Sequence, residues 1–191
     1  MERPELGGIV LAGGTGTRLD GVDKAGIEIA GHTLLEHVLD ALTEVTEVVV
    51  VGEDVPTTRP VTFLREDPPR SGPAAGLLAG LRGFPRAPRY VAVLAVDMPL
   101  VTTATVRRLM LSAERDGAVL VDEKGRTQRL CAIYRTDALL EAAPRPDKVP
   151  GMSMKSLVAD LRVAKVPAVA WEAQDVDTWK DLRTMRERLE G

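Results

Sequence analysis

Short apolar runs rich in β-branched residues alternate with helical patterns along this chain of 191 residues. The strongest run, Tyr90–Val96, has the length and composition of a strand buried on both faces. Apolar residues at helical spacing fill the intervals between such runs. The pattern predicts strands at 8–12, 47–52, 61–64, 90–96, 117–121 and 129–134, and helices at 32–43, 72–82, 102–113 and 175–189. This alternation is typical of a doubly wound α/β fold, a mostly parallel sheet flanked by helices that binds ligands at the carboxyl ends of its strands.

The composition narrows the class of protein further. With 45% hydrophobic and 28% charged residues, the chain has the size and balance of one globular domain. Its net charge of −3 argues against broad nucleic-acid binding, which requires a strongly basic face. No leader peptide is visible and no apolar run approaches the ~20 residues of a membrane span, so we expect no membrane partner. The single cysteine, Cys131, is expected to pack within a strand, which is compatible with a reducing, cytoplasmic location.

The first predicted strand leads directly into a glycine-rich turn, Gly13-Gly14-Thr15-Gly16, with Arg18 and Lys24 beyond it. Glycines allow backbone N–H groups to approach phosphate oxygens closely, and the two cations can neutralise a polyphosphate. A Walker A loop is excluded because Lys24 does not stand in a Gly-Lys-Ser/Thr sequence, and the dinucleotide fingerprint lacks its third glycine, where Leu19 stands. The turn therefore predicts a nucleoside triphosphate site; the alternative is a glycine turn without a ligand.

A second chemical signal is Asp97, which follows the most apolar of the predicted strands. A carboxylate at the carboxyl end of a parallel strand points into the ligand crevice. Carboxylate oxygens suit Mg²⁺, which usually binds one or two carboxylates, waters and substrate phosphates. Asp97 is therefore a candidate magnesium ligand; the alternative is an aspartate that stabilises a turn.

The motif around the glycine turn resembles the signature of the molybdenum cofactor guanylyltransferases, which belong to a wider family of nucleotidyltransferases. The matching positions are Leu11 to Gly14, Arg18, Gly21, Asp23 and Lys24. Related cytidylyltransferases usually carry Ala-Ala-Gly where this chain has Ala12-Gly13-Gly14, which favours the guanylyl branch. The resemblance implies a Rossmann-like nucleotidyltransferase fold in a single domain, 1–191. Its nucleotide-binding half would cover about 7–100 and its acceptor-binding half about 101–191.

The same resemblance implies which residues act. The implied catalytic residues are Arg18, Lys24 and Asp97. The implied nucleotide-binding residues are Leu11, Ala12, Gly13, Gly14, Lys24, Asp67 and Asp97. Asp97 is the implied ligand of a Mg²⁺ cofactor. Asp177 is a second ligand by resemblance or, alternatively, the cap of the last helix.

The resemblance implies that the chain transfers GMP from GTP to the terminal phosphate of a molybdopterin-type acceptor and releases pyrophosphate. Molybdoenzymes or cofactor-insertion proteins would be its protein partners. A cytidylyltransferase for the same cofactor, or a transferase for another phosphorylated acceptor, is the alternative among enzymes. An accessory protein that binds nucleotide without turnover also stays open, because Asp20, Val51 and Arg129 depart from the family pattern.

The remaining polar residues give weaker signals. Arg126 and Lys155 are candidate contacts for a phosphorylated pterin or, alternatively, solvated surface cations. His32 and His37 are expected to lie five residues apart on one helix and to point in different directions. That arrangement would exclude a metal-binding pair or a catalytic dyad.

Overall fold

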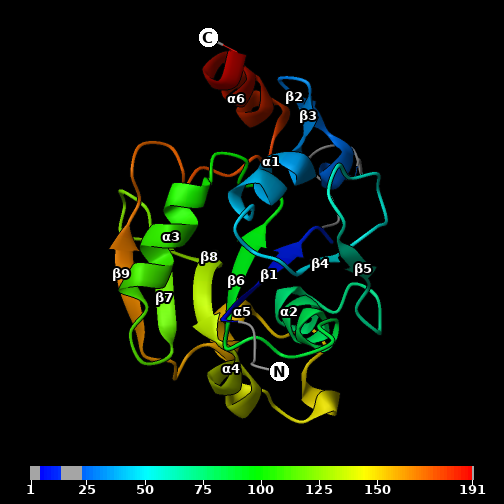
Figure 1. The fold of residues 1–191 in the computed structure, drawn as a ribbon, viewed down its shortest axis with the longest axis vertical. Helices are drawn as coiled ribbons and strands as arrows, with labels where there is room; N and C mark the ends of the chain where they lie inside the picture. The colour runs from blue at the N-terminus through cyan, green and yellow to red at the C-terminus, as the bar shows by residue number, and fades with distance from the viewer. Residues whose placement is uncertain (1–4, 14–22, 191) are drawn as a thin grey trace.

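A computed structural model describes residues 5–13 and 23–190 of the chain. Its main sheet has the order β5-β4-β1-β6-β8, in which the first four strands are parallel and β8 is antiparallel to β6. A parallel pair, β7 and β9, continues beyond β8 (Figure 1). The strands are β1 Leu6–Leu11, β4 Val48–Val51, β5 Thr62–Leu64, β6 Tyr90–Ala95, β7 Gly117–Val121, β8 Thr127–Arg135 and β9 Val163–Pro167.

Helices cover both faces of this sheet. The α-helices are α1 Leu34–Ala41, α2 Pro73–Arg82, α3 Thr103–Ser112, α4 Thr136–Ala142, α5 Met154–Leu157 and α6 Trp179–Glu190. Helices α1, α3 and α6 pack on one face, whereas α2, α4 and α5 pack on the other. None of the helices in the described part of the chain combines the length and the apolar character that crossing a bilayer requires.

The alternation of buried strand residues explains why helices are needed on both sides. In β1, Val10 faces the core beneath α1 and α3, while its neighbour Ile9 faces the core beneath α2. In β4, Val50 likewise faces the core beneath α1 and α3, and Val49 faces the core beneath α2. Successive strand residues point to opposite faces, so a strand that is apolar at every position must be covered twice. The predicted doubly wound, mostly parallel α/β fold is confirmed.

The topology also creates a ligand crevice. Strand β1 lies between β4 and β6. After β1 the chain adds β4 and β5 on one side of it, and then crosses over to add β6 on the other side. Open α/β sheets bind ligands at such a switch point, outside the carboxyl ends of the strands. The crevice is therefore expected where β1 and β6 end, near Leu11 and Ala95.

One local prediction is wrong: His32 does not lie on the first helix. A hairpin of two short strands, β2 (Glu28–Ile29) and β3 (His32–Thr33), precedes α1. Its two-residue turn has positive φ at both positions, Ala30 and Gly31, as tight hairpins require. Thr33 then caps α1 by accepting a hydrogen bond from Glu36 N. Because the chain bends at that cap, the rings of His32 and His37 meet edge-on, 5.7 Å apart.

Cys131 lies in β8 and is fully buried, as predicted for a packing residue. Burial raises the pKa of its thiol far above the usual value, so the sulfur stays protonated. The residue therefore contributes to the core between β8 and the helices and has no nucleophilic character.

Candidate active site

The carboxyl ends of β1, β4 and β6 are tied together by backbone hydrogen bonds. Val96 N donates to Leu11 O at 3.1 Å, which joins the end of β6 to the end of β1. Ala12 N and Gly13 N both donate to Val51 O, at 2.8 and 3.0 Å. These bonds hold the first residues of the glycine turn and the residue before Asp97 in fixed positions at one edge of the sheet.

Two adjoining cavities open at this edge, and we call them the narrow and the wide lobe. The narrow lobe, of about 200 Å³, is lined by residues that include Leu11, Lys24 and Asp97. The wide lobe, of about 700 Å³, extends past the end of β4. Both are lined by Ala12, Gly13, Glu66 and Gly72. The combined hollow has the size of a small-molecule site and lies where the topology predicts one.

Lys24 is held between two carboxylates in the narrow lobe. Its Nζ donates to Asp97 Oδ2 at 3.0 Å and to Asp177 Oδ1 at 2.8 Å. Its side chain is only 12% exposed. Burial alone would lower the pKa of Lys24, but the charges and hydrogen bonds of Asp97 and Asp177 outweigh burial and raise the pKa above its ordinary value. The ammonium group is therefore charged at neutral pH.

The local backbone explains how Lys24 reaches this position. It begins a short 3-10 helix, η2 (Lys24–Gly26), whose first turn is capped by Asp23: Oδ1 accepts a hydrogen bond from Ala25 N at 3.2 Å. Ala25 is fully buried and anchors the turn to the core. Because the turn is fixed on both sides, the lysine side chain is directed into the lobe.

Asp177 reaches the site from the far end of the sequence. It precedes α6, whose first turn is capped reciprocally by Thr178 and Asp181: Asp181 N donates to Thr178 Oγ1, and Thr178 N donates to Asp181 Oδ2. Val176 N donates to Asp97 O at 2.8 Å, which places this segment beside the end of β6. Thr178 supplies the side-chain oxygen that caps α6, so Asp177 is left to contact Lys24.

Asp175 adds a further carboxylate that the sequence motif did not single out as a site residue. Burial raises its pKa most, and the nearby charges of Asp177, Asp97 and Asp181 raise it further. Asp175 therefore lies near other acidic groups, whose mutual repulsion a cation would lower. The motif carried the signal, since Asp175 and Asp177 stand in one short turn.

The donor set suits a divalent cation. Asp97 and Asp177 each place an oxygen within 3.0 Å of the same nitrogen, so both carboxylates already share one cation, the Lys24 ammonium. Two hard carboxylate oxygens beside a phosphate-sized cavity are the ligands that Mg²⁺ prefers. Within the described residues, no group of three or more His, Cys, Asp or Glu side chains is placed to hold a metal by itself. Substrate phosphates would have to complete the coordination.

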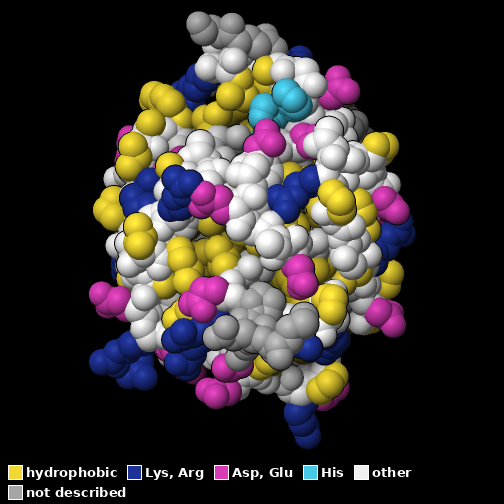
Figure 2. Space-filling view, viewed as in Figure 1, with side chains coloured by type: hydrophobic (Ala, Val, Ile, Leu, Met, Phe, Trp, Pro, Cys, Tyr) yellow, Lys and Arg dark blue, Asp and Glu magenta, His cyan; other side chains and the backbone are white. Residues whose placement is uncertain are grey.

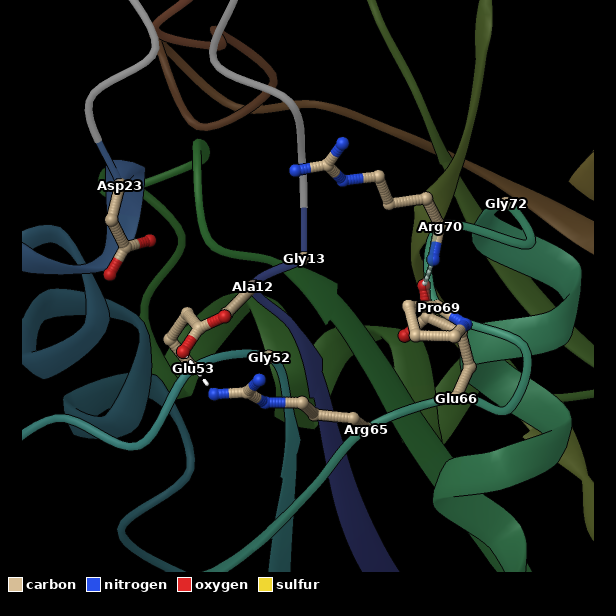
Figure 3. Close-up of a pocket in the computed structure, with 10 residues that line it drawn as sticks. All are labelled: Ala12, Gly13, Asp23, Gly52, Glu53, Arg65, Glu66, Pro69, Arg70 and Gly72. Atoms are coloured by element: carbon tan, nitrogen blue, oxygen red, sulfur yellow. Dashed lines mark hydrogen bonds and ion pairs between the residues drawn. The ribbon is translucent and has the colours of Figure 1, made fainter.

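The wide lobe is lined by a different set of charged residues (Figure 3). Glu66 Oε1 accepts a hydrogen bond from Arg70 N at 2.9 Å. The carboxylate of Glu53 is paired with Arg65, a close contact between side chains that are each 60% exposed. Figure 3 shows the Arg70 side chain reaching from the loop before α2 toward the chain at Gly13. This lobe therefore offers both anionic and cationic groups to a ligand.

Charged side chains are also spread over the rest of the surface. Figure 2 shows Lys and Arg side chains interspersed with Asp and Glu on the face that it presents, with no extended area of one sign. This mixture agrees with the small net charge of −3. On this face, therefore, charge of neither sign forms a broad area.

Some predicted residues lie elsewhere. Gly14 and Arg18 lie outside the described residues. Asp67 is exposed and lines neither lobe, whereas its neighbour Glu66 lines both. Glu66 was not predicted as a site residue, although it directly precedes Asp67.

Neither candidate for the acceptor side lines the two lobes. The Nε of Arg126 donates to Asp122 Oδ2 at 2.7 Å, in the turn between β7 and β8. Lys155 is exposed on α5. The two lobes therefore do not include either of the predicted acceptor contacts.

Comparison with known proteins gives consistent matches. The MobA-like NTP transferase domain family matches residues 8–166. A "probable molybdenum cofactor guanylyltransferase" of Mycobacterium avium (strain 104) is 34% identical over 191 residues and covers 95% of each chain. A relative with the same name from Mycobacterium tuberculosis (strain H37Rv) is 36% identical over 162 residues, or 81% of this chain and 78% of the relative.

Solved structures agree in fold. Molybdopterin-guanine dinucleotide biosynthesis protein A from Archaeoglobus fulgidus superimposes with a TM-score of 0.74 at 24% identity, over 96% of this chain and 98% of the other. The 2-C-methyl-D-erythritol 4-phosphate cytidylyltransferase of Thermus thermophilus gives 0.71 at 22% identity, over 96% and 98%. At these identities the structural likeness establishes the fold alone.

Proposed function

Because the chain belongs to the MobA-like NTP transferase domain family, we propose that it transfers GMP from GTP to the terminal phosphate of a molybdopterin-type cofactor. The relatives that match most of its length bear the name of that guanylyltransferase activity. The observation that carries the proposal is the position of Lys24, charged and enclosed between Asp97 and Asp177 at the carboxyl ends of β1 and β6.

The reaction balances without a base from the protein. An oxygen of the acceptor's terminal phosphate attacks the α-phosphorus of GTP, and the bond between that phosphorus and the oxygen bridging to the β-phosphate breaks. Pyrophosphate leaves with the bonding electrons. The attacking phosphate is already ionised near neutral pH, so positioning and charge neutralisation can carry the step.

The chain's own residues supply both requirements. Lys24, kept protonated by its carboxylate neighbours, is placed to neutralise charge that develops on the leaving pyrophosphate. The backbone at Ala12 and Gly13, held rigidly by Val51 O, forms the floor on which the nucleotide would lie. Arg18 remains the proposed second cation, with Leu11 and Gly14 among the nucleotide contacts. We keep Asp67 as a proposed contact to the exposed rim of the nucleotide.

Asp97 and Asp177 would hold a Mg²⁺ ion. Bound there, the ion would supply positive charge to the reacting phosphates. Because Lys24 already lies between the two carboxylates, it competes for them until the phosphates of a substrate offer it other partners. We therefore propose that the enzyme binds Mg²⁺ more tightly when a nucleotide is bound than when it is absent.

Pyrophosphate release tests the proposal directly. Purified protein is incubated with the molybdopterin-type acceptor, Mg²⁺, and GTP, CTP or ATP in turn. We expect release with GTP, dependent on both acceptor and Mg²⁺. Release with CTP alone would assign the chain to the cytidylyl branch. Binding of GTP without release would favour an accessory protein. The proposed compartment is the cytoplasm, and proteins that insert the finished cofactor into molybdoenzymes are the proposed recipients of the product.

A further inference from the structure

The wide lobe raises a question that the phosphate end of the site does not answer, namely which group identifies the base. If the triphosphate lies beside Lys24 in the narrow lobe, the base extends into the wide lobe that adjoins it. At the carboxyl end of β4 this chain has Val51-Gly52, and neither residue has a side chain that can hydrogen-bond a base. Another group must therefore distinguish guanine from the other bases.

The backbone excludes a base-reading side chain at position 52. A Cβ atom added at Gly52 would lie 2.9 Å from Ala12 Cβ and 3.2 Å from Gly13 N. Contacts this short do not occur between packed atoms, so the close approach of β1 to the end of β4 requires glycine there. Val51 is 1% exposed and apolar.

Among the described residues, three carboxylates line the wide lobe. Glu53 pairs with Arg65 through side chains that are each 60% exposed, and Asp23 caps η2 beside Lys24, at the phosphate end. Of the three, Glu66 is the one that also lines the narrow lobe, so it lies where the two lobes meet. Glu66 Oε1 is anchored by Arg70 N at 2.9 Å. Within residues 5–13 and 23–190, Glu66 Oε2 has no hydrogen bond or ion pair.

The free oxygen also faces an opening at the end of β1. A Cβ atom added at Gly13 would lie 3.9 Å from Glu66 Oε2 and 3.7 Å from Val51 O. The absent side chain leaves room between these two acceptors for the edge of a planar base. Arg70 has a φ of +61°, a left-handed turn that aims its N–H at Glu66 and fixes the carboxylate in this position.

Guanine is the base whose edge matches a fixed carboxylate. It presents N1–H and the N2 amino group side by side, and each carboxylate oxygen can accept such a donor. Adenine and cytosine place a ring-nitrogen acceptor where guanine has N1–H, and uracil flanks its one N–H with two carbonyl groups. A carboxylate would repel those acceptors.

We propose that Glu66 is the residue that selects guanine, by accepting hydrogen bonds from N1–H and the N2 amino group. This inference rests on the proposed function, because it assumes that a nucleoside triphosphate occupies the two lobes. Hydrogen bonds to a charged group are stronger than neutral ones, so losing them should weaken GTP binding by at least about tenfold.

Glu66→Gln is a sharp test because it preserves the loop. The glutamine oxygen can still accept from Arg70 N, which leaves the amide NH₂ directed at the base in place of a carboxylate oxygen. Xanthine has a carbonyl oxygen where guanine has its N2 amino group. The variant should therefore lose affinity for GTP and gain affinity for xanthosine triphosphate, each by at least about tenfold. Glu141→Gln makes the same chemical change at an exposed position on α4 that lines neither lobe, and it should alter neither affinity.

The experiment is calorimetric titration of both variants and the wild type with GTP, inosine, xanthosine and cytidine triphosphates in Mg²⁺. The wild type should prefer GTP to inosine triphosphate, which lacks the N2 amino group. If the wild type prefers GTP but Glu66→Gln keeps that preference over xanthosine triphosphate, the assignment of Glu66 is overturned while the proposed function stands. If the wild type itself prefers cytidine triphosphate, the proposed function fails and the guanine assignment fails with it. Thermal unfolding of each variant establishes that it is folded.

Discussion

A single ammonium group balances two carboxylates at the centre of the candidate site. Removing Lys24 would leave Asp97 and Asp177 facing each other without a cation, and removing Asp97 would leave the lysine with one partner. All three side chains retain some solvent exposure, between 12% and 40%. Water can therefore compensate part of the lost interaction, so substitutions here should affect chemistry more than folding.

We expect Lys24→Ala and Asp97→Ala each to reduce turnover by at least about tenfold, because each removes charge from the reacting phosphates. Circular dichroism should show an unchanged fold. Lys165→Ala is the matched control, since that lysine is exposed on β9 away from both lobes. Steady-state pyrophosphate release measures the effect. Near-normal turnover in either folded variant would contradict the assignment of that residue.

The position of Asp177 supports a separate prediction, about the Mg²⁺ requirement. Asparagine keeps the size of the side chain but lacks the negative charge, so Asp177→Asn should raise the Mg²⁺ concentration required for half-maximal activity by at least about tenfold. The control is Asp160→Asn, at an exposed position that lines neither lobe. Activity is titrated with Mg²⁺ at saturating GTP. An unchanged Mg²⁺ requirement would show that Asp177 acts only through Lys24.

At the scale of elements, α2 packs against β1 through glycines. A Cβ atom added at Gly80 would lie 2.9 Å from Ile9 Cγ2, whereas one added at Gly76 would lie 3.4 Å from Leu11 Cδ2, an ordinary contact. Alanine gains about 1 kcal/mol over glycine in a helix from backbone entropy. Overpacking a rigid core typically costs about 1–3 kcal/mol. Replacing glycine with alanine is therefore expected to lower the free energy of unfolding at position 80 but not at position 76, one helical turn away.

We predict that Gly80→Ala lowers the free energy of unfolding by about 1 kcal/mol and that Gly76→Ala leaves it equal or raises it slightly. Urea denaturation measures both. Equal effects of the two single alanine variants would contradict the close packing of α2 on β1.

Sequence predicts best those helices and strands whose apolar pattern continues over enough residues to exclude another secondary structure. The apolar run Tyr90–Val96 is too long and too uniform to predict anything but a buried strand. Helix α3 follows Thr102, where the predicted helix begins. The β2–β3 hairpin was missed because four strand residues carry no period, and the positive φ of Ala30 is invisible in the sequence. Long helices and strands can therefore be predicted from the apolar pattern, whereas this tight turn could not, because its backbone conformation leaves no such pattern.

The candidate site was predictable in part, for a related reason. Lys24 follows the glycine turn after the first predicted strand, and Asp97 directly follows the strand predicted at 90–96. The structure brings the two side chains together. Asp177 was ambiguous because Thr178 beside it can also cap a helix, and only the contacts distinguish the two. Glu66 was passed over because its role depends on the loop geometry set by Arg70. The functions of Gly14 and Arg18 stay predictions, since they lie outside the part of the chain that the structure describes.

For the whole molecule, the ion pair between Lys24 and Asp177 joins the proposed nucleotide-binding half to the proposed acceptor-binding half. The pKa of Lys24 is raised above its ordinary value of 10.5 in the folded state. A group with a raised folded-state pKa stabilises the fold fully below its unfolded-state pKa, and this contribution is lost as pH rises through the raised value. As pH rises from neutral, this link should therefore persist until the lysine itself loses its proton.

We predict that the difference in unfolding free energy between wild type and Lys24→Met is constant at neutral pH and shrinks above the ordinary lysine pKa. Methionine keeps the length of the side chain without the charge. Urea denaturation of both proteins over a series of pH values measures the difference, which cancels the titration of all other groups. A difference that stays constant into the strongly alkaline range would contradict the ion pairs.

The contact between Lys24 and Asp177 spans 153 positions of the sequence, and this separation has a consequence for protein synthesis. A ribosome completes the four parallel strands β5, β4, β1 and β6 before it has added Asp97, and it adds Asp177 only long afterwards. A domain generally folds as a unit, N-terminal domains first. A half-made polypeptide therefore contains the residues of the narrow lobe up to Asp97 but still lacks the second carboxylate. If Asp177 acts as proposed, the chain becomes competent for catalysis only near the end of its synthesis.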